Sequence, residues 1–411
     1  MNAVAPSDAA RRDPDPPRSG LKLAAWWLAG TAAALVHNGL WATPNLAAMS
    51  RIADNLGGNP FDAGVGPDYL LGSVSLPVLA RLTNQTAPHH YARLHLLVLL
   101  VATAAVTALA KRRIGYRAAR NLTVLVAVSP AMTVSMHWLG QPDPLTMALG
   151  MGMVLVRRRE TAFVLAVIAG LTHPEQAIFM ALVAAGVRPM LEESRNGEPP
   201  AWIEQLRSTV LGGLWSVGGV ILGRAITEVY FQLADIVVHR PRTEYLTFGI
   251  RRFFDFHTQQ PLGLLYTLWG PLWLVIATVA VVRIARRGRD GVAARRWMTF
   301  GVLAVLALVP VAVTLDETRV YAVITAPLLV GAAVALDREF GRSRDRLVSV
   351  SAAALLAIAL VAPGGTATGV TTWRNAFDQT EFRSFLIDGD HPGDLALWLL
   401  GPFDVTIPTV E

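Results

Sequence analysis

The chain has 411 residues, of which 53% are hydrophobic and only 16% are charged, whereas a soluble domain has roughly 25% charged residues. It contains no cysteine, which excludes disulfides and thiolate metal sites. A net charge of +6 would suggest a nucleic-acid partner in a soluble protein. Here the positive charge lies in short loops between apolar runs, so we expect a membrane protein and no nucleic acid.

Long apolar runs follow one another along the chain. Each is close to the roughly 20 residues that a helix needs to cross a hydrocarbon core of about 30 Å. Backbone amides in lipid must bond within their own segment, so the runs are predicted to be helices. They are Leu21–Leu40, Tyr91–Ala110, Val210–Phe231, Leu262–Val282, Met298–Thr314, Tyr321–Leu336 and Leu347–Ala362.

The middle of the chain holds four shorter apolar runs, each bounded by arginines on one side and by a polar segment on the other. The polar segments are Gly140–Asp143 and Thr172–Gln176, and we predict that they form the outward tips of two helical hairpins. The runs are Ala119–Met136, Pro144–Val156, Thr161–Leu171 and Ala177–Val187. The whole pattern predicts an all-α, polytopic transmembrane bundle of about eleven spans.

Arginine-rich loops alternate with loops that are poor in arginine, and this asymmetry predicts the orientation. We place the polar tail 1–20 in the cytoplasm, a transmembrane domain at 21–362 and an external tail at 363–411, in a multi-pass protein of the plasma membrane. The arginine clusters are Lys111–Arg120, Arg157–Arg159, Arg188–Arg207, Arg283–Arg296 and Arg338–Arg346.

The external segments are predicted to be two long loops, 38–90 and 232–261, and the C-terminal tail. A short amphipathic helix is expected at Leu46–Leu56 in the first loop. Aromatic residues in the tail favour helices that lie on the membrane interface, where aromatic rings are stable at the headgroup level. These residues are Trp373, Phe377, Phe382, Phe385 and Trp398.

Ionisable residues at or below a membrane surface are costly, and each is therefore a functional candidate. Asp143 at the first hairpin tip has a carboxylate suited to a sugar hydroxyl or a divalent cation, although an aspartate before a proline also caps a helix. His173 and Glu175 at the second tip suit a metal or a general base; alternatively, they are a polar cap on two short helices.

A third polar segment, Asp316-Glu317-Thr318-Arg319, lies at the outer mouth between two apolar spans. The guanidinium of Arg319 matches phosphate oxygens in a two-point fork, while the alternative is a local ion pair and helix cap. Arg224 and Glu228 are spaced to pair along one helix, and a phosphate contact by Arg224 is the second interpretation.

The first outer loop offers Asp54, Asp62 and Asp68 as general bases, and each is alternatively a solvated turn residue. We expect Asp143, Glu175 and Asp316 to approach one another across a single outward-facing cavity, because all three lie at outer helix ends.

Three stretches carry a family resemblance. They are Asn45–Pro77, the Gly-Gln-x-Asp tip within Trp138–Leu145, and Asp316–Tyr321 followed by Pro327, which reads Asp-x-x-Arg-x-Tyr and is similar to a family segment Asp-x-x-Arg-Tyr…Pro. In these stretches the chain resembles the GT-C superfamily of multi-spanning glycosyltransferases. Members of that superfamily use polyprenyl-phosphate sugars and have the active site at the outer membrane face. Many of them carry an aspartate where this chain has Asn45, which cannot be a base.

The resemblance implies an inverting hexosyl- or pentosyltransferase, with a mannosyltransferase among the candidates. It would move a sugar from a polyprenyl-phosphate donor to a cell-envelope glycan or lipid acceptor, in contact with membrane lipids. The implied catalytic residues are Asp54, Asp68, Asp143 and Glu175. The implied substrate-binding residues are Gln141, His173, Asp316, Glu317, Arg319 and Arg224. A divalent cation, Mg or Mn, is expected on Asp143, His173 and Asp316.

The departure at Asn45 keeps alternatives open. Either Asp54 or Asp68 is the base, or the base comes from another loop, or the chain is a non-catalytic subunit of envelope assembly. A transporter or flippase for a lipid-linked glycan is the main rival function. Because the polar segments all lie on one side, chemistry at a surface is favoured over transport through the midplane.

Overall fold

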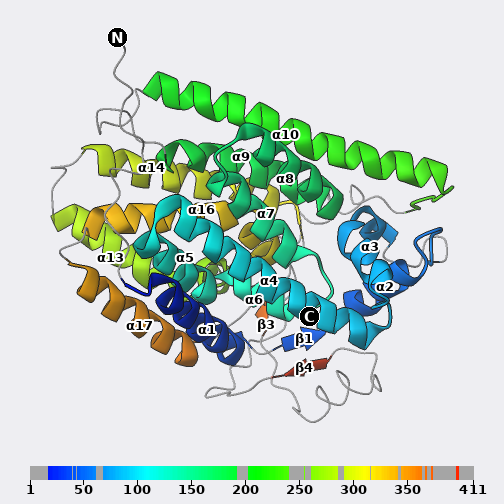
Figure 1. Ribbon diagram of the computed structural model, residues 1–411, viewed down its shortest axis with the longest axis horizontal. Helices are drawn as coiled ribbons and strands as arrows, with labels where there is room; N and C mark the ends of the chain where they lie inside the picture. The colour runs from blue at the N-terminus through cyan, green and yellow to red at the C-terminus, as the bar shows by residue number, and fades with distance from the viewer. Residues whose placement is uncertain are drawn as a thin grey trace.

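The computed structural model (Figure 1) is a helical bundle with two short β pairs. It describes residues 17–38, 40–42, 44–61, 68–191, 202–239, 254, 261–285, 291–314, 316–340, 344–362, 366–367, 372–373 and 395–397. The predicted all-α class is confirmed. The chain is a helical membrane protein, because several of its helices are long and apolar enough to cross a bilayer.

The helices follow one another in chain order. They are α1 (Ser19–Asn38), α2 (Pro44–Asp54), α3 (Ser75–Leu82), α4 (Pro88–Ile114), α5 (Tyr116–Val128), α6 (Pro130–His137), α7 (Asp143–Leu155), α8 (Arg159–Thr172), α9 (Pro174–Val187), α10 (Trp202–Leu233), α12 (Pro261–Trp269), α13 (Leu272–Ala285), α14 (Gly291–Leu306), α15 (Leu308–Val311), α16 (Glu317–Phe340) and α17 (Asp345–Val361). Two 3-10 helices are η2 (Asp68–Gly72) and η3 (Arg188–Leu191).

The predicted count of eleven spans is not confirmed. Within the described ranges, four helices have the length and hydropathy of a membrane span, namely α1, α4, α10 and α16. The pair α12 and α13 would be a fifth, but it is bent by 88°. The remaining apolar runs form helices of 17 residues or fewer, shorter than the roughly 20 residues of a typical span.

Proline and glycine explain where the predicted spans break. The run predicted at Ala119–Met136 divides at Ser129, which has the extended backbone (φ −87°, ψ 161°) that a following proline favours. The Ser129 hydroxyl then accepts a hydrogen bond from the amide of Ala131 and caps α6. The run at Leu262–Val282 bends at Gly270, where φ is +51°, just before Pro271.

Helix α16 is the centre of the bundle, since 83% of its most apolar 18-residue stretch is buried. It packs against α5, α7 and α9. Helix α10 lies along one side over α8 and α9, and α1 lies beside α17 on the opposite side (Figure 1). Helices α2 and α3 are at one end of the bundle (Figure 1).

Small residues allow α8 and α10 to approach closely. A Cβ built on Gly219 of α10 would be 2.8 Å from the Cβ of Ala166 on α8. One turn further along, Gly223 of α10 packs directly on the backbone of Gly170. This is the small-residue helix crossing that membrane proteins use where the hydrophobic effect does not drive association.

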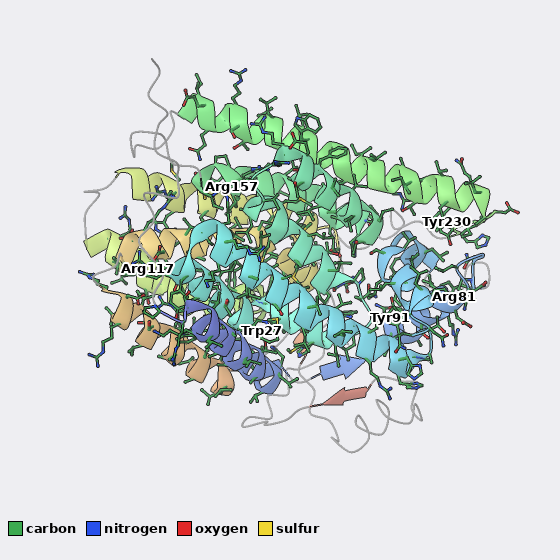
Figure 2. The ribbon with its side chains drawn as sticks, in the orientation of Figure 1. Trp27, Arg81, Tyr91, Arg117, Arg157 and Tyr230 are labelled. Carbon is green, nitrogen blue, oxygen red and sulfur yellow. The ribbon has the colours of Figure 1, made fainter. Side chains whose placement is uncertain are left out.

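The arginine-rich loops gather at one end of the bundle. Arg117 pairs with Asp337 at 2.8 Å, and Arg188 donates to the carbonyl of Arg157 at 2.5 Å. Figure 2 shows Arg117 and Arg157 towards this end and Arg81 at the other. The grouping agrees with alternating loops on two sides of a membrane, and the face on which each end lies stays a prediction.

The opposite end contains the described parts of the two loops that the sequence predicts to be external. Helix α2 forms where the amphipathic helix was predicted. The Tyr230 hydroxyl at the end of α10 donates to the carbonyl of Leu56, and the Asn59 amide donates to the carbonyl of Val237 at 2.8 Å. These bonds join the segment after α2 to the segment after α10.

Two antiparallel β pairs complete the described structure. Strand β1 (Leu40–Ala42) pairs with β4 (Leu395–Leu397), and β2 (Thr366–Ala367) pairs with β3 (Thr372–Trp373). Trp373, predicted to lie on an interfacial helix, is therefore on a strand. The other aromatic residues of the predicted tail helices, Phe377, Phe382, Phe385 and Trp398, lie outside the described residues.

Candidate functional site

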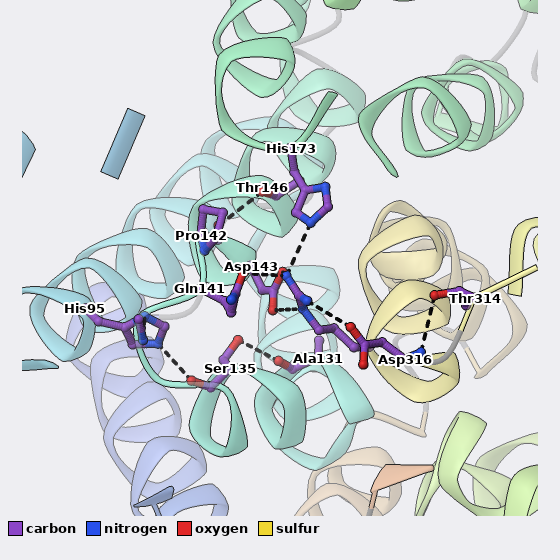
Figure 3. Close-up of polar contacts among 12 residues, drawn as sticks. His95, Ala131, Ser135, Gln141, Pro142, Asp143, Thr146, His173, Thr314 and Asp316 are labelled. Carbon is purple, nitrogen blue, oxygen red and sulfur yellow. Dashed lines mark hydrogen bonds and ion pairs between the residues drawn. The ribbon is translucent and has the colours of Figure 1, made fainter. Parts of the chain in front are cut away.

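Arg319, in the first turn of α16, is the centre of a buried polar cluster. Figure 3 shows Asp143, His173 and Asp316, which belong to this cluster. Its Nε donates to Asp143 Oδ2 at 2.7 Å and its Nη2 donates to Asp143 Oδ1 at 3.2 Å. This is the two-point fork that makes arginine–carboxylate pairs strong. Its Nη1 donates to Asp316 Oδ2 at 3.2 Å. Arg319 thus joins two carboxylates that are far apart in sequence.

Two further side chains complete the shell around the guanidinium. Arg319 Nη2 donates to Gln141 Oε1 at 2.8 Å and lies 3.2 Å from His173 Nε2. Since guanidinium nitrogens only donate, His173 Nε2 must accept, and its proton is on Nδ1. That nitrogen is 3.7 Å from Glu175 Oε2. The Trp138 ring lies 5.5 Å from Arg319 Cζ, within the range of a cation–π contact.

Local sequence explains how these side chains reach one place. Helix α7 begins at Asp143, and its first turn is closed by Thr146, whose amide and hydroxyl both donate to the carbonyl of Pro142. His173 lies at the break between α8 and α9, where Pro174 begins the second helix. Asp316 precedes α16 and its carbonyl accepts from the amide of Val320 at 2.8 Å. Each group therefore lies at a helix end opposite the arginine-rich loops.

Burial divides the cluster into an enclosed part and an exposed edge. Asp143, Gln141 and His173 are fully buried and Arg319 is 3% exposed. The side chains of Asp316 and Glu175 are 32% and 49% exposed. The predicted approach of Asp143, Glu175 and Asp316 is therefore observed, with Asp143 inside and the other two at the exposed edge. The cavity between them stays a prediction.

Charge explains why Asp143 and Arg319 depend on each other. A buried carboxylate without a counter-charge is strongly destabilising, and so is a buried guanidinium. Arg319 carries +1 and its partners Asp143 and Asp316 carry −1 each, so the three groups sum to −1. Asp143 is the first residue of α7 rather than its cap, and its carboxylate turns to Arg319 instead of to the helix backbone.

The predicted metal ligands do not fit a metal ion in this arrangement. Asp143, His173 and Asp316 all direct acceptor atoms at the Arg319 guanidinium, which occupies the position a cation would need. In the described part of the chain, no group of three or more His, Asp and Glu side chains is arranged to hold a metal.

Asp54 is not part of the cluster. Its side chain is 70% exposed and pairs with Arg81 at 3.2 Å, and it also accepts from the hydroxyl of Thr86 at 3.3 Å. Its partners in these contacts lie on α3 and the loop that follows, so the structure does not bring Asp54 to Arg319, and its catalytic role stays a prediction. Asp62 lies outside the described residues.

Asp68 begins η2, although its side chain is outside the described residues. The segment after η2 lies beside His173, since the Val74 amide donates to the carbonyl of Leu171 at 3.0 Å and the Ser75 hydroxyl donates to Thr172 Oγ1 at 2.8 Å. Arg224 forms the predicted ion pair with Glu228 along α10. The Arg224 guanidinium also lies against Gly72 of η2, since a Cβ built there would be 3.0 Å from its Nη1.

Sequence reasoning missed His95 on α4. Its Nε2 donates to the carbonyl of Ser135 at 2.8 Å, and its Nδ1 accepts from the amide of Gly140 at 3.1 Å. The signal was available, because an ionisable residue inside an apolar run is a functional candidate. A single histidine within an apolar run is a weaker pattern than the three polar segments at helix ends.

Comparisons with known proteins identify weak structural likenesses. No family model matches the chain, and no curated protein matches it. Among solved structures, ArnT from Cupriavidus metallidurans in the apo state is 19% identical, with a TM-score of 0.40, over 83% of this chain and 64% of that chain. The same protein bound to undecaprenyl phosphate is 19% identical with a TM-score of 0.39, over 83% and 65%.

An oligosaccharyltransferase from Archaeoglobus fulgidus, in complex with zinc and sulfate, is 13% identical with a TM-score of 0.38, over 82% of this chain and 52% of that chain. This chain therefore spans about half to two thirds of the length of the structures it matches. At TM-scores below 0.5 the likeness supports no functional argument, which must come from the chain's own residues.

Proposed function

We propose that the chain is an integral-membrane glycosyltransferase. It moves a sugar from a polyprenyl-phosphate donor to a cell-envelope glycan or lipid acceptor, at the outer face of the membrane. The Arg319 cluster carries this proposal. It gathers two aspartates, a histidine–glutamate pair and one arginine from three distant segments onto one end of the bundle. Two of these segments, those of Asp143 and of Asp316 with Arg319, belong to the stretches that resemble the GT-C motifs.

We place the donor phosphate at the exposed edge of the cluster, beside Arg319 Nη1. Nη1 carries two N–H groups, and Asp316 accepts from one of them. The N-termini of α7 and α16 meet at this point, and helix N-termini favour negative charge. The guanidinium and the helix ends would neutralise charge as it develops on the departing phosphate, which is the usual form of electrostatic catalysis.

The catalytic base is assigned to the exposed edge as well. Both oxygens of Asp143 accept from Arg319, so that carboxylate is occupied and serves to orient the arginine. Asp316 and Glu175 are partly exposed and can reach an acceptor hydroxyl. One of them takes the hydroxyl proton as the oxygen attacks the anomeric carbon, and the sugar–phosphate bond breaks with its electrons going to the phosphate. Direct attack inverts the anomeric centre.

Two further roles are part of the same proposal. Asp68 is a third candidate base, because the segment after η2 lies beside His173. No step is routed through a metal ion, since the acceptor atoms that would bind one are directed at Arg319. The sugar transferred is a hexose or a pentose, and mannose is among the candidates.

The outer-face location makes a prediction of its own. A reporter that is active only outside the cytoplasm should give signal when fused after Glu411 and none when inserted at Arg289. The arginine asymmetry is the reason, since positively charged loops stay in the cytoplasm. Signal from the Arg289 fusion with none from the Glu411 fusion would put the Arg319 cluster on the cytoplasmic side and contradict the proposal.

The reaction is tested with membranes, a radiolabelled polyprenyl-phosphate sugar and a cell-envelope acceptor fraction. The wild-type protein should transfer label to the acceptor, and Asp316→Asn and Glu175→Gln should keep the fold because both side chains are partly exposed. We expect the variant that removes the base to lower the transfer rate by about 10²-fold or more. The other variant should lower the transfer rate less.

Glu160→Gln is the matched control. Glu160 is also an exposed first-turn glutamate, but it lies at the opposite end of α8, and we expect unchanged transfer. Movement of label across vesicles without transfer would instead identify a transporter. Absence of both from a correctly folded protein would favour the assembly subunit.

A further inference from the structure

His95 is buried inside the apolar run of α4 and is not used by the mechanism above. It is fully enclosed, with 0% exposure, and a buried polar ring is costly unless it is hydrogen-bonded. Both nitrogens are. Nε2 lies 2.8 Å from the carbonyl oxygen of Ser135 on α6 (Figure 3), and Nδ1 lies 3.1 Å from the amide nitrogen of Gly140.

The two partners fix the protonation of the ring. A carbonyl only accepts, so Nε2 carries the proton, and a backbone amide only donates, so Nδ1 carries none. His95 is thus held as the neutral Nε2–H tautomer. Its Nδ1 supplies an acceptor to the amide at the centre of the Gly140 turn.

That turn carries Gln141 and Asp143, the two residues between α6 and α7 that accept hydrogen bonds from Arg319. It is closed by a hydrogen bond from the amide of Gln141 to the carbonyl of Trp138 at 3.1 Å. Gln141 follows Gly140 directly, and its Oε1 accepts from Arg319. Asp143 lies two residues further on and forms the fork. A shift of the Gly140 amide would therefore move both side chains that accept hydrogen bonds from Arg319.

We infer that His95 is a positioning residue for the proposed transfer reaction. By holding the Gly140 amide, it fixes the turn that sets Gln141 and Asp143 against Arg319. The inference rests on the proposed function for its catalytic consequence, while its structural consequence can be measured without any activity.

Two isosteric substitutions separate the two hydrogen bonds. His95→Asn places an amide oxygen where Nδ1 stood, so it keeps the acceptor for Gly140 and loses the donor to Ser135. His95→Gln places an amide nitrogen near the former Nε2, so it keeps the donor to Ser135 and loses the acceptor for Gly140. A role limited to filling the core predicts the larger effect from His95→Asn, because asparagine has the smaller side chain.

The first readout is hydrogen–deuterium exchange of the peptide that contains residues 139–142, measured on the full chain in detergent. We expect faster exchange in His95→Gln and near-wild-type exchange in His95→Asn. The second is the transfer assay, in which His95→Gln should lower kcat roughly 10²-fold with little change in the donor KM. His95→Asn should retain most of the wild-type kcat.

A matched control is His137→Gln. His137 is also a buried histidine, on α6, and its Nε2 lies 2.9 Å from the carbonyl of Asn38, a contact that glutamine can keep. Exchange at residues 139–142 and kcat should both be unchanged.

Equal exchange in His95→Asn and His95→Gln would overturn the inference, and so would faster exchange in His95→Gln with wild-type kcat. If the wild-type protein shows no transfer, the proposed function has failed. The exchange comparison still supports or overturns the role of His95 in holding the turn.

Discussion

Arg319→Ala is expected to destabilise the protein as well as to abolish transfer. The substitution leaves Asp143 fully buried with no counter-charge, and breaking a buried pair by removing one partner costs about 3–5 kcal/mol. From sequence alone, Arg319 was interpreted as a phosphate contact or as part of a local ion pair and helix cap, with no buried partner from a distant segment. The fork to Asp143 changes that expectation, and loss of activity in Arg319→Ala cannot by itself report on catalysis.

A double substitution separates the two effects. Asp143→Asn combined with Arg319→Met removes both charges, so the unfolding midpoint in detergent should recover much of what Arg319→Ala loses. Transfer should stay absent, because the guanidinium is gone. Arg319→Lys should be intermediate, since an ammonium keeps the charge but not the planar fork. We expect its rate to fall by about one to two decades, as for the loss of a charge-assisted contact worth roughly 1.5–3 kcal/mol.

The controlling measurements are the unfolding midpoint and the transfer rate of the same preparations. Normal stability and normal transfer in Arg319→Ala would show that the cluster is neither buried nor required. Recovery of transfer in the double variant would show that Arg319 acts only as the counter-charge of Asp143.

Gly140→Ala should disable the site by displacing its turn. Gly140 has φ +93°, a left-handed conformation that costs a residue with a Cβ roughly 1–2 kcal/mol. A Cβ there would also lie 2.9 Å from the Cα of Leu46, so α2 or the turn must move. Because Gln141 and Asp143 follow in the chain, we expect transfer to fall roughly 10²-fold.

Gly115→Ala is the control for backbone strain. Gly115 has a similar φ of +84°, but a Cβ built there meets nothing within 4 Å, and it lies between α4 and α5, at the arginine-rich end. Its unfolding midpoint should fall slightly while transfer stays at the wild-type rate. Equal losses of transfer in both variants would mean that the contact with Leu46 does not matter.

The sequence patterns predicted the features that depend on local order. Apolar runs and helix-end signals place Asp143, Glu175 and Asp316 at the same end of the bundle, and the structure brings them together. The spacing of Arg224 and Glu228 was enough to predict their ion pair. The amphipathic helix in the first outer loop is likewise a local property.

The features that were missed depend on partners distant in sequence. Arg319 is enclosed by Gln141, Asp143 and His173, which are 146 to 178 positions away in the sequence. No local pattern shows that these side chains accept the hydrogen bonds of its guanidinium. Asp54, the last residue of α2, pairs with Arg81 on α3, and the structure does not place it in the cluster. The predicted count of eleven spans is not confirmed, since a proline divides an apolar run and composition alone does not show whether a helix continues through it.

The most direct test of the central claim is the position of a bound donor phosphate. Electron cryomicroscopy of the protein in lipid nanodiscs with a polyprenyl phosphate should show the phosphate at the exposed edge of the Arg319 cluster. We predict that it lies within hydrogen-bond distance of Arg319 Nη1 or of the first turn of α16, with the isoprenyl chain between helices. Phosphate density at the arginine-rich end beside Arg157, with none near Arg319, would contradict the assignment of this cluster as the transferase site.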